Sequence, residues 1–144
     1  MTPTFFGRIQ TRIFLIAVIG SLWTVVITPF LPTEGSLADT YRATFAVLVV
    51  VLVLGLAWEV LYQGLQQFRW EKDWPTGFGL VLGIPEGIAV WLVIQAGLAP
   101  GDPEISGAAF VIHFATTWLV TYLFVLGPMR VPFLRWRFRG GRIV

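Results

Sequence analysis

A glutamate lies in the middle of a long apolar stretch, where an ionisable side chain is costly and marks a candidate functional site. Glu86 follows Pro85 inside the largely apolar residues 77–98. Proline removes one backbone hydrogen bond and leaves a carbonyl acceptor near the acid. Glu86 is expected to be neutral unless a cation lies nearby. Three roles stay open: a structural lock between the third and first spans, a proton or ion site, or a partner for another subunit's basic group.

The single histidine, His113, is the second candidate. Its depth in the fourth apolar stretch is expected to be similar to that of Glu86. Thr117 and Thr121 follow at helical spacings of four, so they share its face. Three roles are open for His113: a neutral histidine bonded to a threonine or carbonyl, a proton relay with Glu86, or ligation of haem or a metal.

A polar face follows the second apolar stretch. Glu59, Gln63 and Gln66 recur at spacings of four and three, which places them on one side of a helix. Glu59 is expected at the membrane boundary, where water or Gln63 could satisfy it. If this face is buried, it would instead form the cytoplasmic mouth of a polar path to Glu86.

Catalytic signatures are missing from the sequence. There is no Cys, which excludes disulfides, thiolate metal sites and thiol catalysis. The motifs HExxH, GxSxG and the Walker loop are absent, and none of the three serines stands in a catalytic setting. We therefore predict no catalytic residue, no metal site and no cofactor, with haem at His113 as the remaining option.

The composition defines the class of protein. Of 144 residues, 56% are hydrophobic and 12% charged, and the mean hydropathy is +0.78. Since one span needs about 20 apolar residues, the chain is predicted to be a single membrane domain, an all-α four-helix bundle with up-down antiparallel topology. The predicted spans are about 13–31, 43–62, 77–98 and 107–126, followed by a basic tail, 127–144.

Small residues predict where the helices pack. Gly79, Gly83 and Gly87 recur every fourth residue beside Glu86, and such ladders let helix backbones approach closely. The first span carries a stripe of small and hydroxylated residues: Ala17, Ser21, Thr24 and Thr28. We expect this stripe to face another helix, with Thr24 joining Glu86, His113, Thr117 and Thr121 in a polar interior.

The basic residues predict the orientation. On one side of the predicted bundle, two Arg lie in the N-terminal head (residues 1–12), Arg69 and Lys72 lie in the second loop, and five Arg lie in the tail. The other side has Arg42 alone, so nine of the ten Lys and Arg residues lie on one side. Both termini are therefore expected in the cytoplasm. In the tail, Arg135, Trp136, Arg137 and Arg139 suit anionic lipid headgroups or an acidic surface of another protein. Nucleic-acid binding is not expected so close to the bilayer.

One stretch carries a resemblance. The runs WEVLYQ at 58–63 and LQQFRWEKDWP at 65–75, continuing to Glu86-Gly87, resemble uncharacterised small four-span membrane proteins of high-GC Gram-positive bacteria. The resemblance implies a plasma-membrane location and no particular activity.

The predicted function follows from these features together. We expect a non-enzymatic accessory or assembly subunit that packs against other membrane proteins or against itself. The alternative is a small proton- or ion-coupled transporter or channel built on Glu86 and His113. An enzyme subunit or a cofactor-holding module is the third option.

Overall fold

The protein is an all-α membrane bundle of four spans. The structure is a computed structural model and describes residues 4–68 and 77–144; Arg69 and Lys72, used above for orientation, lie outside them. Within the described residues there is no strand. The helices that are long and apolar enough to cross a membrane are Phe5–Phe30, Leu37–Gln66, Phe78–Gln95 and Gly107–Arg130.

The first span begins earlier than the sequence indicated. It runs through α1 (Phe5–Phe14), the π-helical segment η1 (Leu15–Gly20), α2 (Ser21–Ile27) and the short 3-10 turn η2 (Thr28–Phe30). The Thr4 side chain caps the helix by accepting a bond from the Gly7 N–H. The expected boundary at residue 13 followed the apolar run, whereas the helix includes Arg8 and Arg12 because both find carboxylate partners.

The other spans match the predicted positions to different degrees. The second, α3 (Leu37–Gln66), starts before residue 43 because Ser36 caps its first turn. The third is divided into α4 (Phe78–Val81) and α5 (Gly83–Gln95). The division lies just ahead of Pro85, which thus falls in the first turn of α5, where a missing N–H costs no helical bond. The fourth, α6 (Gly107–Leu126), has the predicted bounds.

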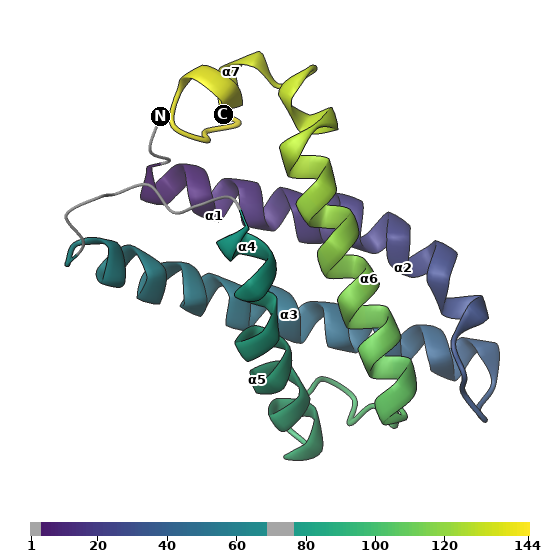
Figure 1. The fold of residues 1–144 in the computed structure, drawn as a ribbon. Helices are drawn as coiled ribbons and strands as arrows, with labels where there is room; N and C mark the ends of the chain where they lie inside the picture. Colours follow the sequence, from purple (N-terminus) through teal and green to yellow (C-terminus); the bar gives the residue numbers. More distant parts are fainter. Residues whose placement is uncertain (1–3, 69–76) are drawn as a thin grey trace.

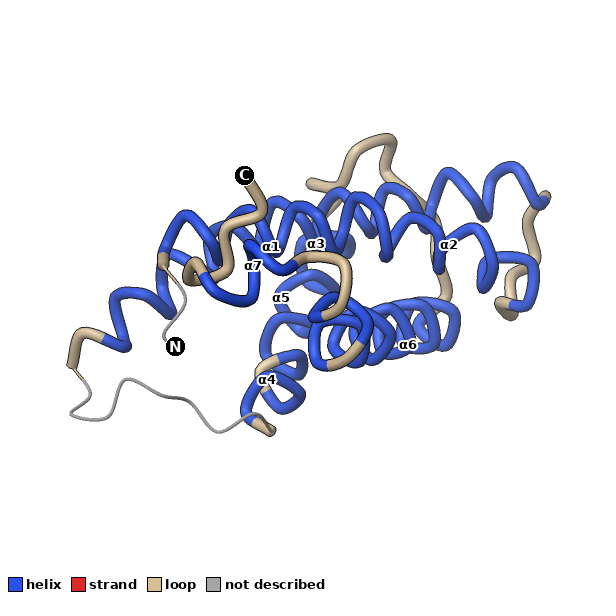
Figure 2. Tube along the Cα trace, turned by 90° about the horizontal axis from the view of Figure 1, so that it is seen from above, coloured by secondary structure: helices blue, strands red, loops and turns tan. Residues whose placement is uncertain are grey.

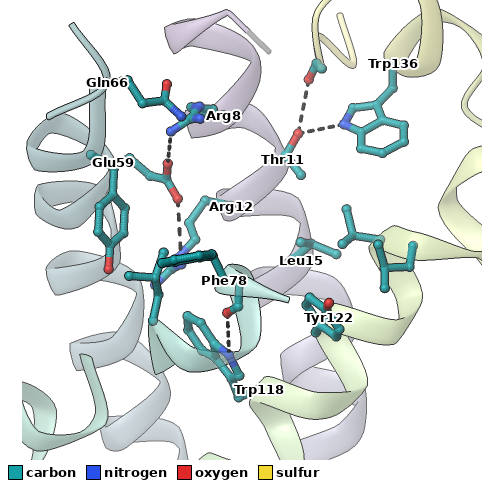
Figure 3. Close-up of a pocket in the computed structure, with 16 residues that line it drawn as sticks. Arg8, Thr11, Arg12, Leu15, Glu59, Gln66, Phe78, Trp118, Tyr122 and Trp136 are labelled. Carbon is teal, nitrogen blue, oxygen red and sulfur yellow. Dashed lines mark hydrogen bonds and ion pairs between the residues drawn. The ribbon is translucent and has the colours of Figure 1, made fainter. Parts of the chain in front are cut away.

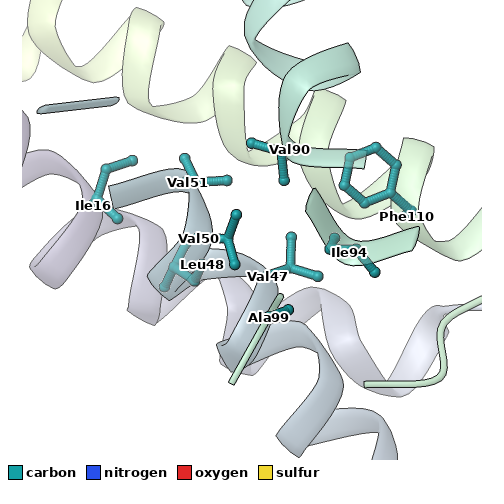
Figure 4. Packing of buried hydrophobic residues seen from close by; sticks show 9 residues of the cluster. All are labelled: Ile16, Val47, Leu48, Val50, Val51, Val90, Ile94, Ala99 and Phe110. Atoms are coloured by element: carbon teal, nitrogen blue, oxygen red, sulfur yellow. The ribbon is translucent and has the colours of Figure 1, made fainter. Parts of the chain in front are cut away.

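The helices form two antiparallel pairs. In Figure 1, α1 and α2 run alongside α3, and the pair α5 and α6 crosses them obliquely. Figure 2, seen from above, places α5 and α6 on one side of the layer formed by the first pair. Between the layers, α3 supplies more of the buried apolar cluster than any other helix, with Val47, Leu48, Val50 and Val51 (Figure 4). They pack with Ile16, Val90, Ile94, Ala99 and Phe110.

The glycine ladder lies against α6 and not against the first span. The ring of Tyr122 packs on Gly79, that of Trp118 on Gly83 and that of Phe114 on Gly87. These rings recur every fourth residue along α6, so a stripe of aromatic side chains fills the groove that the missing glycine side chains leave. The ladder thus packs the third span against the fourth, whereas the third and first spans are joined by the contact of Glu86 with Arg12.

The C-terminal tail folds back on the N-terminus. After the 3-10 turn η3 (Pro128–Arg130), α7 (Leu134–Phe138) leads to Gly140, whose carbonyl accepts a bond from the Thr4 N–H at 2.8 Å. The Ile143 N–H donates to the Gln10 side chain at 2.8 Å. Both ends of the chain therefore lie together, beside α7 in Figure 1.

Candidate functional site

The centre of the site is Arg12, an arginine of the first span that is shared by two carboxylates. Its Nη1 lies 3.8 Å from Glu59 of α3, and its Nη2 contacts Glu86 of α5. Glu59 also lies 3.7 Å from Arg8, one helical turn before Arg12. Glu86 has no exposed surface, and neither of its oxygens has a further hydrogen-bond partner among the described residues. The cation beside Glu86 is thus Arg12, which the sequence analysis had assigned to the short segment before the first span.

Two further residues fix the Arg12 guanidinium. Its Cζ lies 5.2 Å from the centroid of the Trp118 ring, within the range of a cation–π contact. On the side of α3, the guanidinium lies over Gly55, where a Cβ atom on residue 55 would overlap it. Arg12 therefore touches residues from all the other spans, which are Glu59 and Gly55 on α3, Glu86 on α5 and Trp118 on α6.

A cleft reaches this cluster from the end of the bundle where both termini lie. Its volume is about 410 Å³. One side of the cleft is polar, and its labelled members in Figure 3 are Arg8, Arg12, Glu59 and Gln66. The other side is apolar and aromatic and includes Leu15, Phe78, Trp118, Tyr122 and Trp136. The Glu59 side of the bundle is thus open as far as Arg12, which separates the cleft from Glu86.

His113 belongs to a second polar group, away from Glu86. Its Nε2 lies 2.9 Å from the Thr24 hydroxyl, and no hydrogen bond or ion pair joins it to Glu86. Nδ1 of His113 and Oγ1 of Thr117 are both buried without a partner among the described residues. Both residues line a cavity of about 10 Å³ together with Trp118 and Thr121. Trp118 therefore borders the cleft on one side and this small cavity on the other.

Hydroxyl groups continue from Thr24 toward the opposite end of the bundle. Thr28 donates to the Thr24 carbonyl at 2.6 Å and lies 3.0 Å from the Thr44 hydroxyl. Thr44 donates to the Thr40 carbonyl, and the Thr40 hydroxyl lies 3.0 Å from that of Thr33. Thr24, Thr28 and Thr44 are almost completely buried. The result is a polar series that runs from His113 to the loop before α3.

The remaining residues of the predicted polar interior lie as follows. Thr121 is buried and donates to the Thr117 carbonyl at 2.9 Å. Pro85 is exposed on the outer face of α5, so it shapes the helix and does not line the site. Gln63 has a buried side-chain oxygen without a partner among the described residues, whereas Gln66 lines the cleft.

The tail residues separate into two groups. Arg135, Arg137 and Arg139 are exposed, but Trp136 turns inward and its indole N–H donates to the Thr11 hydroxyl at 2.8 Å. Trp136 was expected to dip into the headgroup region with the arginines, and instead it holds α7 against α1. The difference arises because the tail folds back on α1, where Thr11 accepts this bond.

Sequence reasoning missed Arg12, Arg8, Gly55 and Trp118. A signal existed for three of them, since Arg8 and Arg12 are four residues apart, as are Gly55 and Glu59. Arg8 and Arg12 could have been matched as a basic stripe with Glu59, and Gly55 one turn before Glu59 leaves space for a long side chain. Trp118 carried no comparable signal, because its position depends on the packing of α6 against the glycine ladder.

Comparison with known proteins identifies no family. No protein-family model matches the chain, and no solved structure matches it. Heme A synthase of Jannaschia sp. (strain CCS1) is 27% identical over 99 residues, which cover 63% of this chain and 26% of that protein. The chain thus spans about a quarter of the length of this relative, to which it is similar in part.

Proposed function

We propose that this multi-pass membrane protein is non-enzymatic and moves protons across the bilayer, with Glu86 as the proton-accepting site. The observation that carries the proposal is that Arg12 is shared between Glu59 and Glu86. When Glu86 takes up a proton, its O–H bond forms and its charge contact with Arg12 is lost. Arg12 then keeps Glu59 as its counterion, so the change leaves no isolated cation in the membrane, which would cost several kcal/mol.

The polar groups on either side of Glu86 support a path. The cleft leads from the end with both termini to Arg12, and the hydroxyl series leads from His113 to the other end. Between them stands Trp118, which borders both cavities. In the proposed cycle Trp118 moves aside and the proton passes from Glu86 to the small cavity, where a water can occupy a volume of about 10 Å³.

Reconstitution tests this proposal. The full chain is placed in liposomes with an internal pH dye, and a membrane potential is imposed with potassium and valinomycin. We expect proton flux above that of empty liposomes and a loss of at least about tenfold in Glu86→Gln, in the range for removing a proton-transfer group. Glu104→Gln makes the same chemical change at an exposed loop position and keeps the flux. Flux equal to that of empty liposomes, or unchanged in Glu86→Gln, refutes the proposal.

The proposed orientation places the end with both termini in the cytoplasm and the protein in the plasma membrane. Arg8, Arg12 and the tail arginines lie at this end, and basic residues are retained on the cytoplasmic side. Cysteines introduced one at a time at Arg142 and Asp102, on opposite ends of the bundle, test the orientation by labelling intact cells with a membrane-impermeant maleimide. We expect labelling at residue 102 and not at residue 142. The opposite pattern would reverse the proposed orientation.

A second candidate function is that of an accessory subunit. It is favoured by the exposed Arg135, Arg137 and Arg139, which form no ion pair with a described acidic residue. These guanidinium groups suit anionic headgroups or an acidic surface of another membrane protein, or of a second copy. Extraction from native membranes in mild detergent should then yield a stoichiometric complex that Arg135→Gln/Arg137→Gln/Arg139→Gln dissociates. A homogeneous self-oligomer would refute the role of an accessory subunit.

The partial similarity to heme A synthase raises haem as a cofactor. The arrangement around His113 does not fit it, because Nε2 is engaged by Thr24 and the neighbouring cavity holds about 10 Å³. The larger cleft is lined by no histidine among the described residues. We therefore assign no step to haem, and a visible absorption spectrum of the protein purified from haem-replete cells tests this directly.

A further inference from the structure

The cleft above Arg12 contains hydrogen-bond donors that the described residues leave without acceptors. The Tyr62 hydroxyl and the Nε atoms of Arg8 and Arg12 are buried and have no partner among the described residues. All three residues line the cleft. A buried donor without an acceptor costs about 1–3 kcal/mol, so three in one cleft point to a ligand that supplies acceptor atoms.

The charges around the cleft decide what kind of acceptor fits. Arg8 and Arg12 contribute two positive charges, and Glu59 and Glu86 two negative ones, so the cluster is neutral overall. An anionic head would add an uncompensated charge to a neutral, largely buried cluster, which is unfavourable. An uncharged carbonyl oxygen accepts from these donors without that cost.

The opposite wall of the cleft is suited to a flat ring. Trp118 and Trp136 both line it, and their indole N–H groups are already bonded, to the Gly79 carbonyl at 3.1 Å and to the Thr11 hydroxyl at 2.8 Å. Their rings are therefore held in place before any ligand binds, which lowers the entropic cost of binding. Leu82, Val125 and Leu126 complete an apolar wall.

We propose that this cleft binds the head of a lipid-soluble quinone, a neutral ring with carbonyl acceptors and an apolar tail. The cleft volume of about 410 Å³ lies within the usual range for small-molecule sites. The ring lies against the tryptophans, a carbonyl accepts from Tyr62, and the tail leaves along the apolar wall toward lipid. Binding alone is proposed, and it does not depend on the proton path described above.

Titration of the purified full chain with decylubiquinone tests the proposal, because quinones quench tryptophan fluorescence and two tryptophans line the cleft. We expect saturable quenching in the wild-type protein. Tyr62→Phe removes one donor and should weaken binding about fivefold. Leu126→Phe fills the cleft and should weaken it at least about tenfold, whereas Leu123→Phe, an exposed position on the same helix, should leave it unchanged.

Three outcomes would overturn the proposal. Linear quenching without saturation indicates partition into detergent, and equal affinity in the wild-type protein, Tyr62→Phe and Leu126→Phe places any binding elsewhere. Competition by lauric acid at the same concentration as the quinone would assign the cleft to anionic amphipaths instead. Quinone binding is read from tryptophan fluorescence and proton transfer from flux into liposomes, so the two proposals can fail separately.

Discussion

Arg12 and Glu86 are in contact although they belong to the first and third spans and are separated by 74 positions along the chain (86 − 12). Glu86 has no exposed surface, so its charge depends on this arginine. The contact converts a costly intramembrane acid into half of an ion pair. It also makes the first span, through Arg12, a part of the site that the third span carries.

The two members of this pair should be energetically coupled. Glu86→Gln leaves Arg12 paired with Glu59, so we expect a loss of about 1–3 kcal/mol in the free energy of unfolding, as for a lost hydrogen-bond partner. Arg12→Gln leaves Glu86 buried without a cation and should cost about 3–5 kcal/mol, as for other broken buried pairs. The double variant should cost less than the sum, as measured by unfolding in mixed detergent micelles. Strict additivity would show that the two side chains are not coupled.

A methyl group at Gly55 should disturb Arg12 from the side of α3. The added Cβ would overlap the guanidinium, so Gly55→Ala should cost about 1–3 kcal/mol of stability, as overpacking does. Gly64→Ala is the matched control, because it lies on the same helix with open space around it. That change should be neutral or stabilising by up to about 1 kcal/mol. Equal effects at the two positions would contradict the placement of Arg12.

The close approach of Gly7 to the tail predicts a second effect of a single methyl group. A Cβ at Gly7 would overlap the Gly140 carbonyl, and Gly140 itself has a positive φ of 60°. Gly7→Ala should therefore release the tail from α1. Trypsin should then cut at Arg135, Arg137 and Arg139 several times faster than in the wild-type protein. Gly35→Ala, which has ordinary space for a methyl group, should not change the rate.

The hydrogen bond between His113 and Thr24 should contribute measurably to the free energy of unfolding. Thr24→Val keeps the shape of the side chain and removes the hydroxyl that His113 Nε2 contacts at 2.9 Å, leaving a buried polar group unsatisfied. We expect a loss of about 1–3 kcal/mol. Thr33→Val removes a hydroxyl from a partly buried loop position and should cost less. An equal cost for both would mean that His113 finds another partner.

The number and order of the helices could be predicted because hydropathy and length suffice to define a span. The bounds of α6 agree with the prediction at both ends, since Ser106 caps its start and Gly127 follows its last residue. The start of the first span could not be predicted in this way. Arg8 and Arg12 interrupt the apolar pattern, and only their partners on other helices explain why the helix continues through them.

The direction in which side chains face was harder to predict than the positions of the spans. The stripe expected on the first span began at Ala17, which is exposed, whereas the buried positions are Ile16, Gly20, Thr24 and Thr28. The π-helical segment η1 explains the difference, because its wider turn shifts the register of the residues around it. A regular helical period cannot anticipate such a shift.

A relay between Glu86 and His113 was one of three roles left open for His113. It rested on the similar depth of the two residues, and depth does not fix the rotation of a helix. The rotation of α6 is set by Phe114 and Trp118, whose rings lie on Gly87 and Gly83. With these rings facing the third span, His113 faces Thr24 of the first. Which residues meet inside the bundle therefore depends on how side chains of different size interlock, and this is not encoded in the spacing of one helix.

The sharing of Arg12 also has a consequence for how the chain is made. Synthesis starts at the N-terminus, so Arg8 and Arg12 are produced before either of their carboxylate partners. The second span brings Glu59, which leaves a net charge of +1 in the cluster (two arginines and one glutamate), and the third span brings Glu86 and restores neutrality. The newly made first hairpin thus has an unbalanced charge that only the third span neutralises, which gives the later half of the protein a role in completing the insertion of the earlier half.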